Sequence, residues 1–393
     1  MFSFSLSQVR ADTPGCANVL HFNNAGASLI TRQALDTTMN YLQREAAIGG
    51  YEAARLANAT IEKVYDSTAR LLNAHRDEIA LVENATRAWD MAFYAISFQP
   101  GDRILTSIAE YASNYISFLQ IARKYGVFIE AIPNDEQGQL SIEALKNQID
   151  KRVRLIAVTH VPTNGGLVNP AAEIGKVAKE AGILYLLDAC QSVGQMPIDV
   201  EAIGCDMLSA TGRKYLRGPR GTGFLYVRRK AMEQLEPPFL DLHAATWTSK
   251  DQYEMLPNAR RFETWESNVA GKIGLGAALD YAMNLGLENT YARIIALASQ
   301  LRNRLKGIKH VKVYDLGAER CGIVTFTIEG KEVIALRDAL FQMGINVSTT
   351  SPNHTRLDSE ARNLPPMVRA SVHYYNSEAE VERFGLVIEM LAN

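Results

Sequence analysis

The chain has 393 residues, of which 47% are hydrophobic, and a formal net charge of −2 at pH 7. That length allows a large core and predicts two domains, one of which could be small. The near-neutral charge argues against a general nucleic-acid-binding protein, and no apolar run approaches the roughly 18 residues that a membrane span needs.

The cysteines and histidines show no metal-binding or disulfide pattern. None of Cys16, Cys190, Cys205 and Cys321 forms a CxxC pair, and the HExxH pattern is absent. The first residues, MFSFSLSQVRADTPG, lack the long apolar region of a secretory signal. We therefore expect a soluble protein with reduced thiols in the cytoplasm.

In chain order, short apolar runs alternate with helical patterns from residue 78 onwards. Strands are expected at 78–82, 102–107, 126–132, 154–160, 183–189 and 223–229, with helices at about 86–97, 112–125 and 170–182. The strands are almost continuously apolar, which is typical of strands that are buried on both faces. The alternation predicts a parallel or mixed sheet covered by helices.

The remainder of the chain has a different pattern. A helical pattern at about 268–306 is followed by the strand-like runs HVKVYD, IVTFTIE and INVST, by a helix at about 331–343, and by a C-terminal helix from about 378. This part is expected to form a smaller α+β domain. We expect an N-terminal segment at 1–20 that packs on the small domain, a large domain at 21–270 and a small domain at 271–393.

Several polar side chains follow the predicted strands. Thr86 comes after the first strand, Asn164 after the fourth, Asp188 and Gln191 at the end of the fifth, and Lys214 before the sixth. In open α/β sheets, ligands bind at the carboxyl ends of the strands. These residues are far apart in sequence, but the sheet could bring them together.

The chemical types of these side chains suit pyridoxal 5′-phosphate. A lysine amine can form a Schiff base with an aldehyde, and an aspartate can keep a pyridine nitrogen protonated, which makes the ring an electron sink. Backbone amides and a hydroxyl at a helix N-terminus can bind a phosphate. Taken alone, Lys214 could also grip a phosphate or lie in an ordinary basic loop, although no Walker pattern explains the glycines that follow it.

Three sequence elements together resemble the class V aminotransferase family, which includes cysteine desulfurases, selenocysteine lyases, C–S lyases and isopenicillin N epimerase-like proteins. They are Asp-x-x-Gln at 188–191, the lysine before GPRGTG at 218–223, and Arg-x-Ser-x-x-x-Tyr-Asn at 369–376. The likeness runs from HFNNAGAS at 21–28 to residue 384. It implies the α/β fold type I of PLP-dependent transferases, in which a mostly parallel seven-stranded sheet forms the large domain and a smaller α+β domain follows.

The resemblance also implies roles for individual residues. Lys214 would bind the cofactor covalently, Asp188 would pair with its pyridine nitrogen, and Tyr111 would stack on the ring where relatives have a histidine. The other cofactor contacts implied are Ala85, Thr86 and Thr211 on the phosphate, Arg213 in place of a phosphate-binding histidine, Asn164 and Gln191 on the ring hydroxyl, and Thr264. The substrate contacts implied are Arg369 on the α-carboxylate, and Asn24, Ala25 and Gly26 along the substrate side.

Simpler interpretations stay open for some of these residues. Thr86 could be a helix N-cap, Tyr111 could serve packing alone, and Arg369 could belong to an ordinary ion pair. Asp188 could merely end a strand.

The sequence departs from the family in three places. Trp265 and Glu266 stand where many relatives have a Gly-Thr pair that reaches the phosphate in the neighbouring subunit. A carboxylate there would repel a phosphate, unless Thr264 substitutes or Glu266 turns towards an arginine. Tyr111 replaces histidine and could also donate a proton. The segment at 347–366, where cysteine desulfurases carry a mobile cysteine, has none.

The leading functional hypothesis is a C–S lyase that eliminates sulfur from a substituted cysteine or its sulfoxide, without a catalytic cysteine. An aminotransferase or amino-acid epimerase is the alternative, and a non-catalytic relative of the fold is the third. We expect a homodimer with interface active sites that binds a small amino acid, and neither nucleic acid nor membrane.

Overall fold

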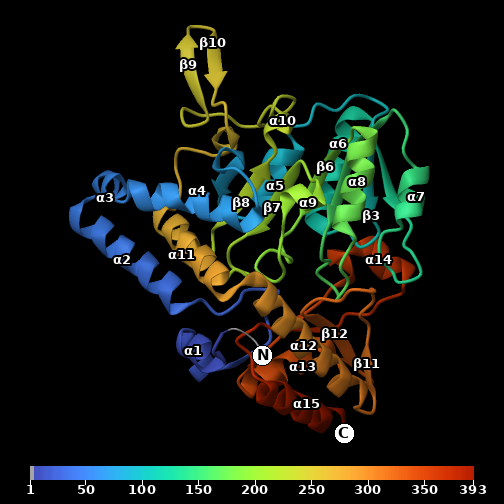
Figure 1. Ribbon diagram of the computed structural model, residues 1–393. Coiled ribbons are helices and arrows are strands. Elements are labelled where there is room, and N and C mark those ends of the chain that lie inside the picture. The colour runs from blue at the N-terminus through green and yellow to red at the C-terminus, as the bar shows by residue number, and fades with distance from the viewer. Residues whose placement is uncertain (1–3) are drawn as a thin grey trace.

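The computed structural model describes residues 4–393, so the first three residues of the expected N-terminal segment lie outside it. A seven-stranded sheet forms the centre of the molecule (Figure 1). Its strands in spatial order are β2 (Ile79–Val82), β8 (Gly223–Val227), β7 (Met207–Thr211), β6 (Leu184–Asp188), β5 (Val153–Thr159), β3 (Arg103–Ser107) and β4 (Phe128–Ile132). Only β8 runs antiparallel to its two neighbours, which confirms the predicted α/β fold with a mostly parallel sheet.

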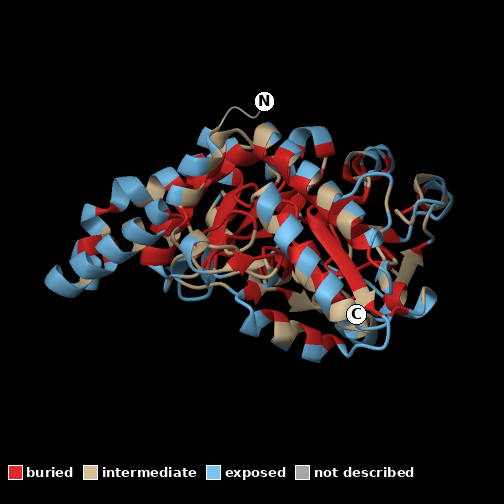
Figure 2. Cartoon of the chain, turned by 90° about the horizontal axis from the view of Figure 1, so that it is seen from below, coloured by how far each residue is buried: buried red, intermediate tan, exposed pale blue. Residues whose placement is uncertain are grey.

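Helices cover both faces of this sheet. They are α5 (Ala85–Phe93), α6 (Ala112–Tyr125), α7 (Ile142–Asn147), α8 (Ala171–Ala181), α9 (Val200–Ile203) and α10 (Arg229–Met232). Along β6, Tyr185 and Leu187 belong to one core cluster while Leu184 and Leu186 belong to another. Because side chains alternate across a strand, the continuous apolar run of β6 fills two cores. Figure 2 shows these buried strands between helices whose outer faces are exposed.

The N-terminal region adds elements that the sequence pattern did not predict. They are α1 (Leu6–Ala11), η1 (Pro14–Ala17), β1 (Leu20–His21), α2 (Arg32–Ile48), α3 (Gly50–Leu56), α4 (Asn58–Leu72) and η2 (Arg76–Glu78). Helices α2 and α4 pack against α11 (Val269–Leu285). The helical pattern predicted at about 268–306 forms two helices, because α11 ends at Leu285 and Gly286, whose φ of 81° lies in the left-handed region, separates it from α12 (Leu287–Lys306).

The C-terminal region contains a second sheet. Its order is β11 (Val311–Val313), β12 (Ile323–Ile328), β15 (Val368–Ser371) and β14 (Ser348–Thr349), and all of its strand pairs are antiparallel. The helical elements here are α13 (Val333–Gln342), η4 (Pro352–His354), α14 (Arg356–Ala361) and α15 (Glu378–Ala392). The strand predicted at 345–349 is split, because β13 (Ile345–Asn346) pairs with β1 instead of joining this sheet.

Two further features complete the fold. A hairpin of β9 (Ala245–Ser249) and β10 (Gln252–Met255), followed by η3 (Ala259–Phe262), projects from the body in Figure 1. Arg10 of the N-terminal segment donates to Tyr375 O at 3.0 Å and pairs with Glu380 at 2.9 Å. The domain divisions at residues 20 and 270 stay a proposal. Across residues 4–393, every helix is too short or too polar to cross a bilayer.

Candidate active site

A cavity of about 470 Å³ is lined by the loops that follow β2, β3, β5, β6 and β7. Of the residues predicted from the sequence, those that line it are Ala85, Thr86, Tyr111, Asp188, Gln191, Arg213 and Lys214. The sheet thus brings together side chains that are more than a hundred positions apart. Asn24, Ala25, Gly26, Asn164, Thr211, Thr264 and Arg369 lie outside the wall of this cavity.

The N-terminus of α5 forms one end of the cavity. Asn84 is the N-cap and accepts from Arg87 N at 2.9 Å, so Ala85 and Thr86 are the first helical residues and the N-cap interpretation of Thr86 is wrong. The first N–H groups of a helix have no partner within it and suit an anion. Gly223 makes room here, because a Cβ on it would lie 2.8 Å from Asn84 C.

Arg213 lines the cavity, and Thr211 contacts Arg213 from outside the wall. Arg213 Nη1 donates to Thr211 Oγ1 at 3.2 Å, and Thr211 Oγ1 donates to Thr222 O at 3.3 Å. Thr211 therefore lies behind Arg213 and accepts a hydrogen bond from its guanidinium, while Arg213 itself lines the cavity.

Asp188 ends β6 with its carboxylate buried. Its Oδ1 accepts from Cys190 N and its Oδ2 from Asn114 Nδ2, both at 2.9 Å. Burial raises the pKa of this carboxyl, and these two hydrogen bonds together with the charge of Lys214 offset only part of the rise. A buried carboxylate of this kind gains most from a cationic partner in the cavity.

Lys214 lies on the loop between β7 and β8, with its Nζ 3.2 Å from Cys190 Sγ. The loop is fixed by its backbone, since Arg217 N donates to Lys214 O at 2.9 Å. It is also fixed by the fully buried Arg217 side chain, whose Nε donates to Leu29 O at 2.9 Å and whose Nη1 donates to Tyr374 OH at 3.0 Å. The amine is therefore held by a rigid turn.

Two buried amides have an unused acceptor. Gln191 Nε2 donates to Ala25 O at 3.0 Å, and Asn164 Nδ2 donates to Ser351 O and Thr355 Oγ1 at 3.0 Å each. Within residues 4–393, Gln191 Oε1 and Asn164 Oδ1 find no hydrogen-bond partner. Buried oxygens of this kind normally accept a hydrogen bond, so a ligand hydroxyl would satisfy them.

Arg369 lies on β15 behind the cavity wall. Its Nη1 donates to Thr163 O at 3.1 Å and to Thr163 Oγ1 at 2.6 Å, and Thr163 lines the cavity. Burial lowers the pKa of this guanidinium. Its Nε has no hydrogen bond, and none of the ion pairs in the described chain includes Arg369, which argues against the ordinary ion-pair interpretation.

The loop at 24–26 joins the two halves of the site. Asn24 Nδ2 donates to Ser371 O at 2.7 Å and Ala25 N donates to Ser371 Oγ at 2.8 Å, while Gly26 N donates to Asn23 O at 3.0 Å. Since Ala25 O accepts from Gln191, this loop connects β15 to the Asp-x-x-Gln segment.

Sequence reasoning missed part of the wall. The missed lining residues are Glu83, Asn84, Asn114, Thr159, Val161, Thr163, Cys190, Arg220 and Gly221. Asn114 and the nearby Glu110 lie in the stretch AEYASN that contains Tyr111, and their spacing of four residues at a helix start was the available signal.

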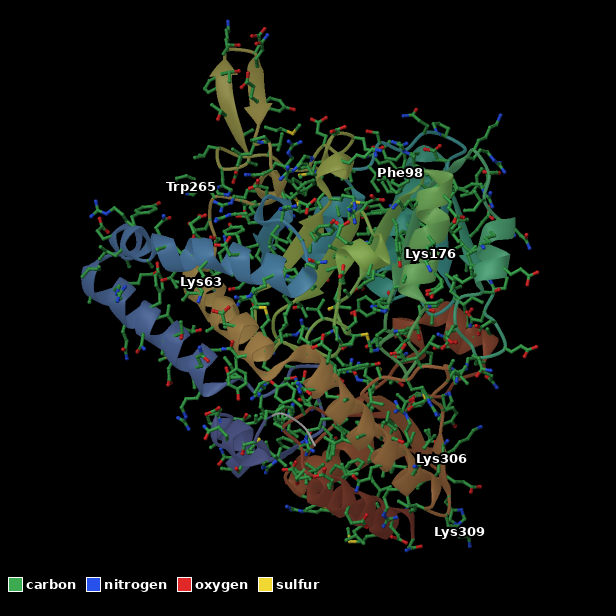
Figure 3. All side chains as sticks on the ribbon, in the orientation of Figure 1. Lys63, Phe98, Lys176, Trp265, Lys306 and Lys309 are labelled. Atoms are coloured by element: carbon green, nitrogen blue, oxygen red, sulfur yellow. The ribbon has the colours of Figure 1, made fainter. Side chains whose placement is uncertain are left out.

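A smaller cavity adjoins the first and shares Glu83 and Gly221 with it. Thr264 and Glu266 line this second cavity, and Thr264 Oγ1 donates to Glu266 O at 3.3 Å. No ion pair of Glu266 occurs in the part of the chain that the structure describes, so of the two alternatives the turn of Glu266 towards an arginine is not observed. Trp265, labelled in Figure 3, is 53% exposed.

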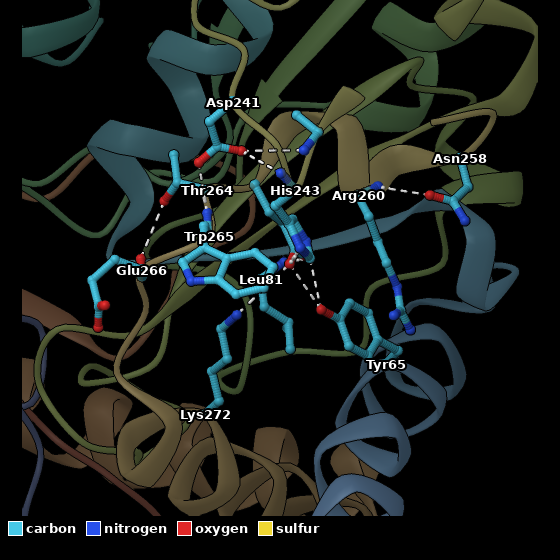
Figure 4. A network of polar contacts seen from close by, with 12 residues as sticks. Tyr65, Leu81, Asp241, His243, Asn258, Arg260, Thr264, Trp265, Glu266 and Lys272 are labelled. Carbon is cyan, nitrogen blue, oxygen red and sulfur yellow. Dashed lines mark hydrogen bonds and ion pairs between the residues drawn. The ribbon is translucent and has the colours of Figure 1, made fainter. Parts of the chain in front are cut away.

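Glu263 holds this segment through contacts with its neighbours, of which Figure 4 labels Tyr65, Leu81, His243 and Lys272. Its carboxylate accepts from Tyr65 OH at 2.8 and 2.9 Å and from Leu81 N at 2.8 Å, and it lies 3.3 Å from His243 Nε2 and 3.7 Å from Lys272 Nζ. Burial acts to raise the pKa of Glu263, but the contacts with His243, Lys272, Leu81 and Tyr65 outweigh it, so that the pKa is lowered.

These groups fit pyridoxal 5′-phosphate. The cavity offers a lysine amine, a buried carboxylate and a helix N-terminus beside an arginine, and unpartnered amide oxygens lie next to it. The amine suits the aldehyde, the carboxylate suits a protonated pyridine nitrogen, and the helix end suits the phosphate.

Comparison with known proteins agrees with this fit. The profile of the family described as "Aminotransferase class-V" matches residues 20–384. A probable cysteine desulfurase of Methanothermobacter thermautotrophicus is 30% identical over 348 residues, which cover 88% of this chain and 86% of that protein. The apo structure of a cysteine desulfurase from Thermococcus onnurineus superposes with a TM-score of 0.92 at 28% identity, covering 100% of this chain and 99% of the other.

A second solved structure supports the fold. The complex of the cystine C–S lyase C-DES with cysteine persulfide matches with a TM-score of 0.86 at 24% identity, over 96% of this chain and 99% of that one. At this identity, the likeness concerns the fold alone.

The Glu263 anchor predicts a pH-dependent stability. Because the pKa of Glu263 is lowered from its ordinary 4.5, its stabilising effect is full above that value and disappears as the pH falls through the lowered pKa. Glu263→Gln should therefore reduce the free energy of unfolding at pH 7. Removing one partner of a fully buried ion pair costs about 3–5 kcal/mol. Because His243 and Lys272 keep some contact with water, we expect a smaller loss of about 2 kcal/mol. The difference from wild type should shrink in denaturant titrations below pH 4.5. The exposed neighbour Glu266 provides the control, because Glu266→Gln should change stability little at either pH.

Proposed function

Because the chain belongs to the class V aminotransferase family of PLP-dependent enzymes, we propose that it is a carbon–sulfur lyase. It would remove the sulfur group from the β-carbon of a substituted cysteine or its sulfoxide by α,β-elimination. The observation that carries this proposal is the absence of any thiol at 347–366. A desulfurase that passes sulfur through a persulfide needs a nucleophilic thiolate on an accessible segment.

The four cysteines of the chain do not supply such a thiolate. Cys205 and Cys321 are fully buried, and burial raises the pKa of both. Cys16 packs against the main core, where burial also raises its pKa. Cys190 does line the cavity, beside Lys214, but burial raises its pKa more than the charge of Lys214 lowers it. A protonated thiol is a poor nucleophile, so sulfur should leave to a diffusing acceptor.

The roles of the chain's own residues follow from where they lie. Bound pyridoxal 5′-phosphate supplies an electron sink for the pair released at the α-carbon. Asp188 holds the proton on the ring nitrogen, and Lys214 Nζ is the base that takes the α-proton. Arg369 binds the substrate carboxylate with the donors that Thr163 leaves free. Tyr111 lines the cavity and is the donor that protonates the departing sulfur.

Product analysis tests the lyase. Incubation with S-substituted cysteines and their sulfoxides should release the sulfur product, pyruvate and ammonia in equal amounts, and Lys214→Ala should abolish all three. A variant with all four cysteines changed to serine or alanine should keep cofactor binding and turnover. Loss of turnover with cofactor still bound, or a persulfide trapped on Cys190, would identify a desulfurase instead. Amino-group transfer to a keto acid, or racemisation without pyruvate, would identify an aminotransferase or an epimerase.

Arg369 provides a second test. Charged hydrogen bonds are each worth roughly 1.5–3 kcal/mol, and a tenfold change in affinity is about 1.4 kcal/mol. Arg369→Ala should therefore weaken amino-acid binding by one to a few decades while the cofactor spectrum stays unchanged. The exposed Arg356, on α14, provides the control, because Arg356→Ala should leave substrate binding as it is. Spectral titration with a non-reactive amino acid measures both, and unchanged affinity of Arg369→Ala would refute its role.

We also propose a homodimer. Helices α2 and α3 expose large apolar side chains towards solvent, namely Met39, Leu42, Ile48, Tyr51 and Leu56, and Tyr51 is 77% exposed. Such apolar faces are typical of protein–protein interfaces, and the second copy would lie beside the segment that carries Thr264 and Glu266. Light scattering should give twice the chain mass, and Tyr51→Glu should shift the mass towards the monomer. An active monomer in the wild type would contradict the proposal. A cytoplasmic location stays a prediction.

A further inference from the structure

Glu110 is a buried carboxylate that the mechanism above does not use. It lies between β3 and α6, immediately before Tyr111, and it is 3% exposed. Its oxygens accept hydrogen bonds from Tyr111 N at 2.8 Å, Thr159 N at 2.9 Å, Thr106 Oγ1 at 3.0 Å, Asn114 Nδ2 at 2.8 Å and Thr159 Oγ1. Five donors from three segments converge on one carboxylate, which is far more than is needed to end a strand or to cap a short turn.

Asn114 connects Glu110 to Asp188. Its Nδ2 donates to Glu110 Oε1 at 2.8 Å and to Asp188 Oδ2 at 2.9 Å. An amide nitrogen carries two hydrogens, so each carboxylate receives one of them and the amide group is fixed in one orientation. Asn114 is buried and lines the cavity. A chain of contacts therefore runs from Glu110 through Asn114 to the carboxylate that faces the cofactor site.

We propose that Glu110 is a positioning residue for the cofactor: through Asn114 it fixes the orientation of Asp188 and adds a second negative charge behind it. The proposal rests on the cofactor of the family and not on the lyase reaction. The same effect would serve any reaction that this site performs with the cofactor bound.

The electrostatics of the cluster support this role. Burial raises the pKa of Glu110 to about 7, although its contacts with Thr159 and Asn114 work in the opposite direction and Asp188 raises it further. Two neighbouring carboxylates resist being ionised together unless a cation joins them. The other titratable groups near them are Tyr111, Lys214, Cys190 and Tyr185. Lys214 lowers the pKa of Asp188, and burial together with Asp188 raises the pKa of Cys190. The pKa of Tyr185, on β6, is raised by burial and by the charges of Cys205, Glu173 and Glu110. A protonated ring nitrogen beside Asp188 would be the missing cation.

The coupling works in both directions. If a cation at Asp188 favours the ionised form of Glu110, then an ionised Glu110 must favour the cationic form of the cofactor by the same free energy. Removing the charge while keeping the shape of the side chain should therefore weaken cofactor binding. It should also lower the pH at which the bound cofactor loses its protonated, visible-absorbing form.

Glu110→Gln in the cofactor-loaded enzyme tests this inference. The visible band of the bound cofactor should titrate several tenths of a pH unit below the wild-type value. The cofactor dissociation constant, measured by fluorescence quenching after removal and re-addition of pyridoxal 5′-phosphate, should rise about tenfold, which is the size expected for the loss of one charged hydrogen bond. Neither measurement depends on the elimination reaction. An unchanged band and dissociation constant would therefore refute the role of Glu110 without refuting the lyase proposal, and absence of elimination would refute the lyase proposal without refuting the role of Glu110.

Two control variants separate positioning from simple structural support. Thr106→Val removes one hydrogen bond to Glu110 without touching Asn114, so it should lower the melting temperature but leave the visible band in place. Glu110→Asp keeps the charge and should restore most of the band position that Glu110→Gln loses. The proposal would be overturned if Glu110→Gln lowered the melting temperature but changed neither the position of the visible band nor the cofactor dissociation constant.

A double-mutant cycle with Asn114→Ala tests the route of the coupling. When Asn114 is absent, Glu110→Gln should move the band much less than it does in wild type, because the connecting amide is gone. Equal shifts in the two backgrounds would refute the role of Asn114 and with it the proposal. If Glu110→Gln does not fold, Asn114→Ala takes over the test, and a band at the wild-type position would then overturn the inference.

Discussion

The carboxylate of Asp188, buried at the end of β6, is the constraint on which the rest of the site depends. A charge in such a position is costly unless hydrogen bonds and an opposite charge compensate it. Asn114 and Cys190 N supply the hydrogen bonds, and the positive charge of Lys214 lowers its pKa. The cofactor's pyridinium would supply another, so the surroundings of Asp188 favour a cationic ring.

The charge of Lys214 acts on Asp188 from a loop that is held rigidly in place. Arg217 is fully buried without any acidic partner among its hydrogen bonds, and its guanidinium lies 4.7 Å from the centre of the Tyr375 ring. It thus ties the loop after β7 to the N-terminal loop and to the segment that follows β15. Arg217 joins the lysine element to the Arg-x-Ser-x-x-x-Tyr-Asn element, and Gln191 joins the Asp-x-x-Gln element to the loop at 24–26. Residues from the start, middle and end of the chain therefore meet in one place.

The sequence predicts six of the seven strands of the sheet because they are short and apolar, as in β6 and β8, but it does not predict β7 (Met207–Thr211). It predicts several residues that line the cavity, among them Asp188, Gln191 and Lys214, because the Asp-x-x-Gln and lysine elements occur together. It does not predict the break at Gly286, since the apolar pattern continues through it, or the contact between Asn114 and Asp188, which are 74 positions apart. Contacts of this kind depend on the parallel register of β3, β5 and β6, and no local pattern encodes that register.

Lys214 and Asp188 also determine whether Cys190 can act as a nucleophile. Its Sγ lies 3.2 Å from Lys214 Nζ, so distance alone would allow it to accept sulfur. Its backbone N–H, however, is used by Asp188, and its half-buried thiol lies near that carboxylate, whose charge also raises the thiol pKa. The charge that Asp188 needs for the cofactor therefore works against a thiolate at Cys190. A site built around a buried aspartate favours a protonated thiol at this position, which supports the proposal that sulfur leaves to a diffusing acceptor.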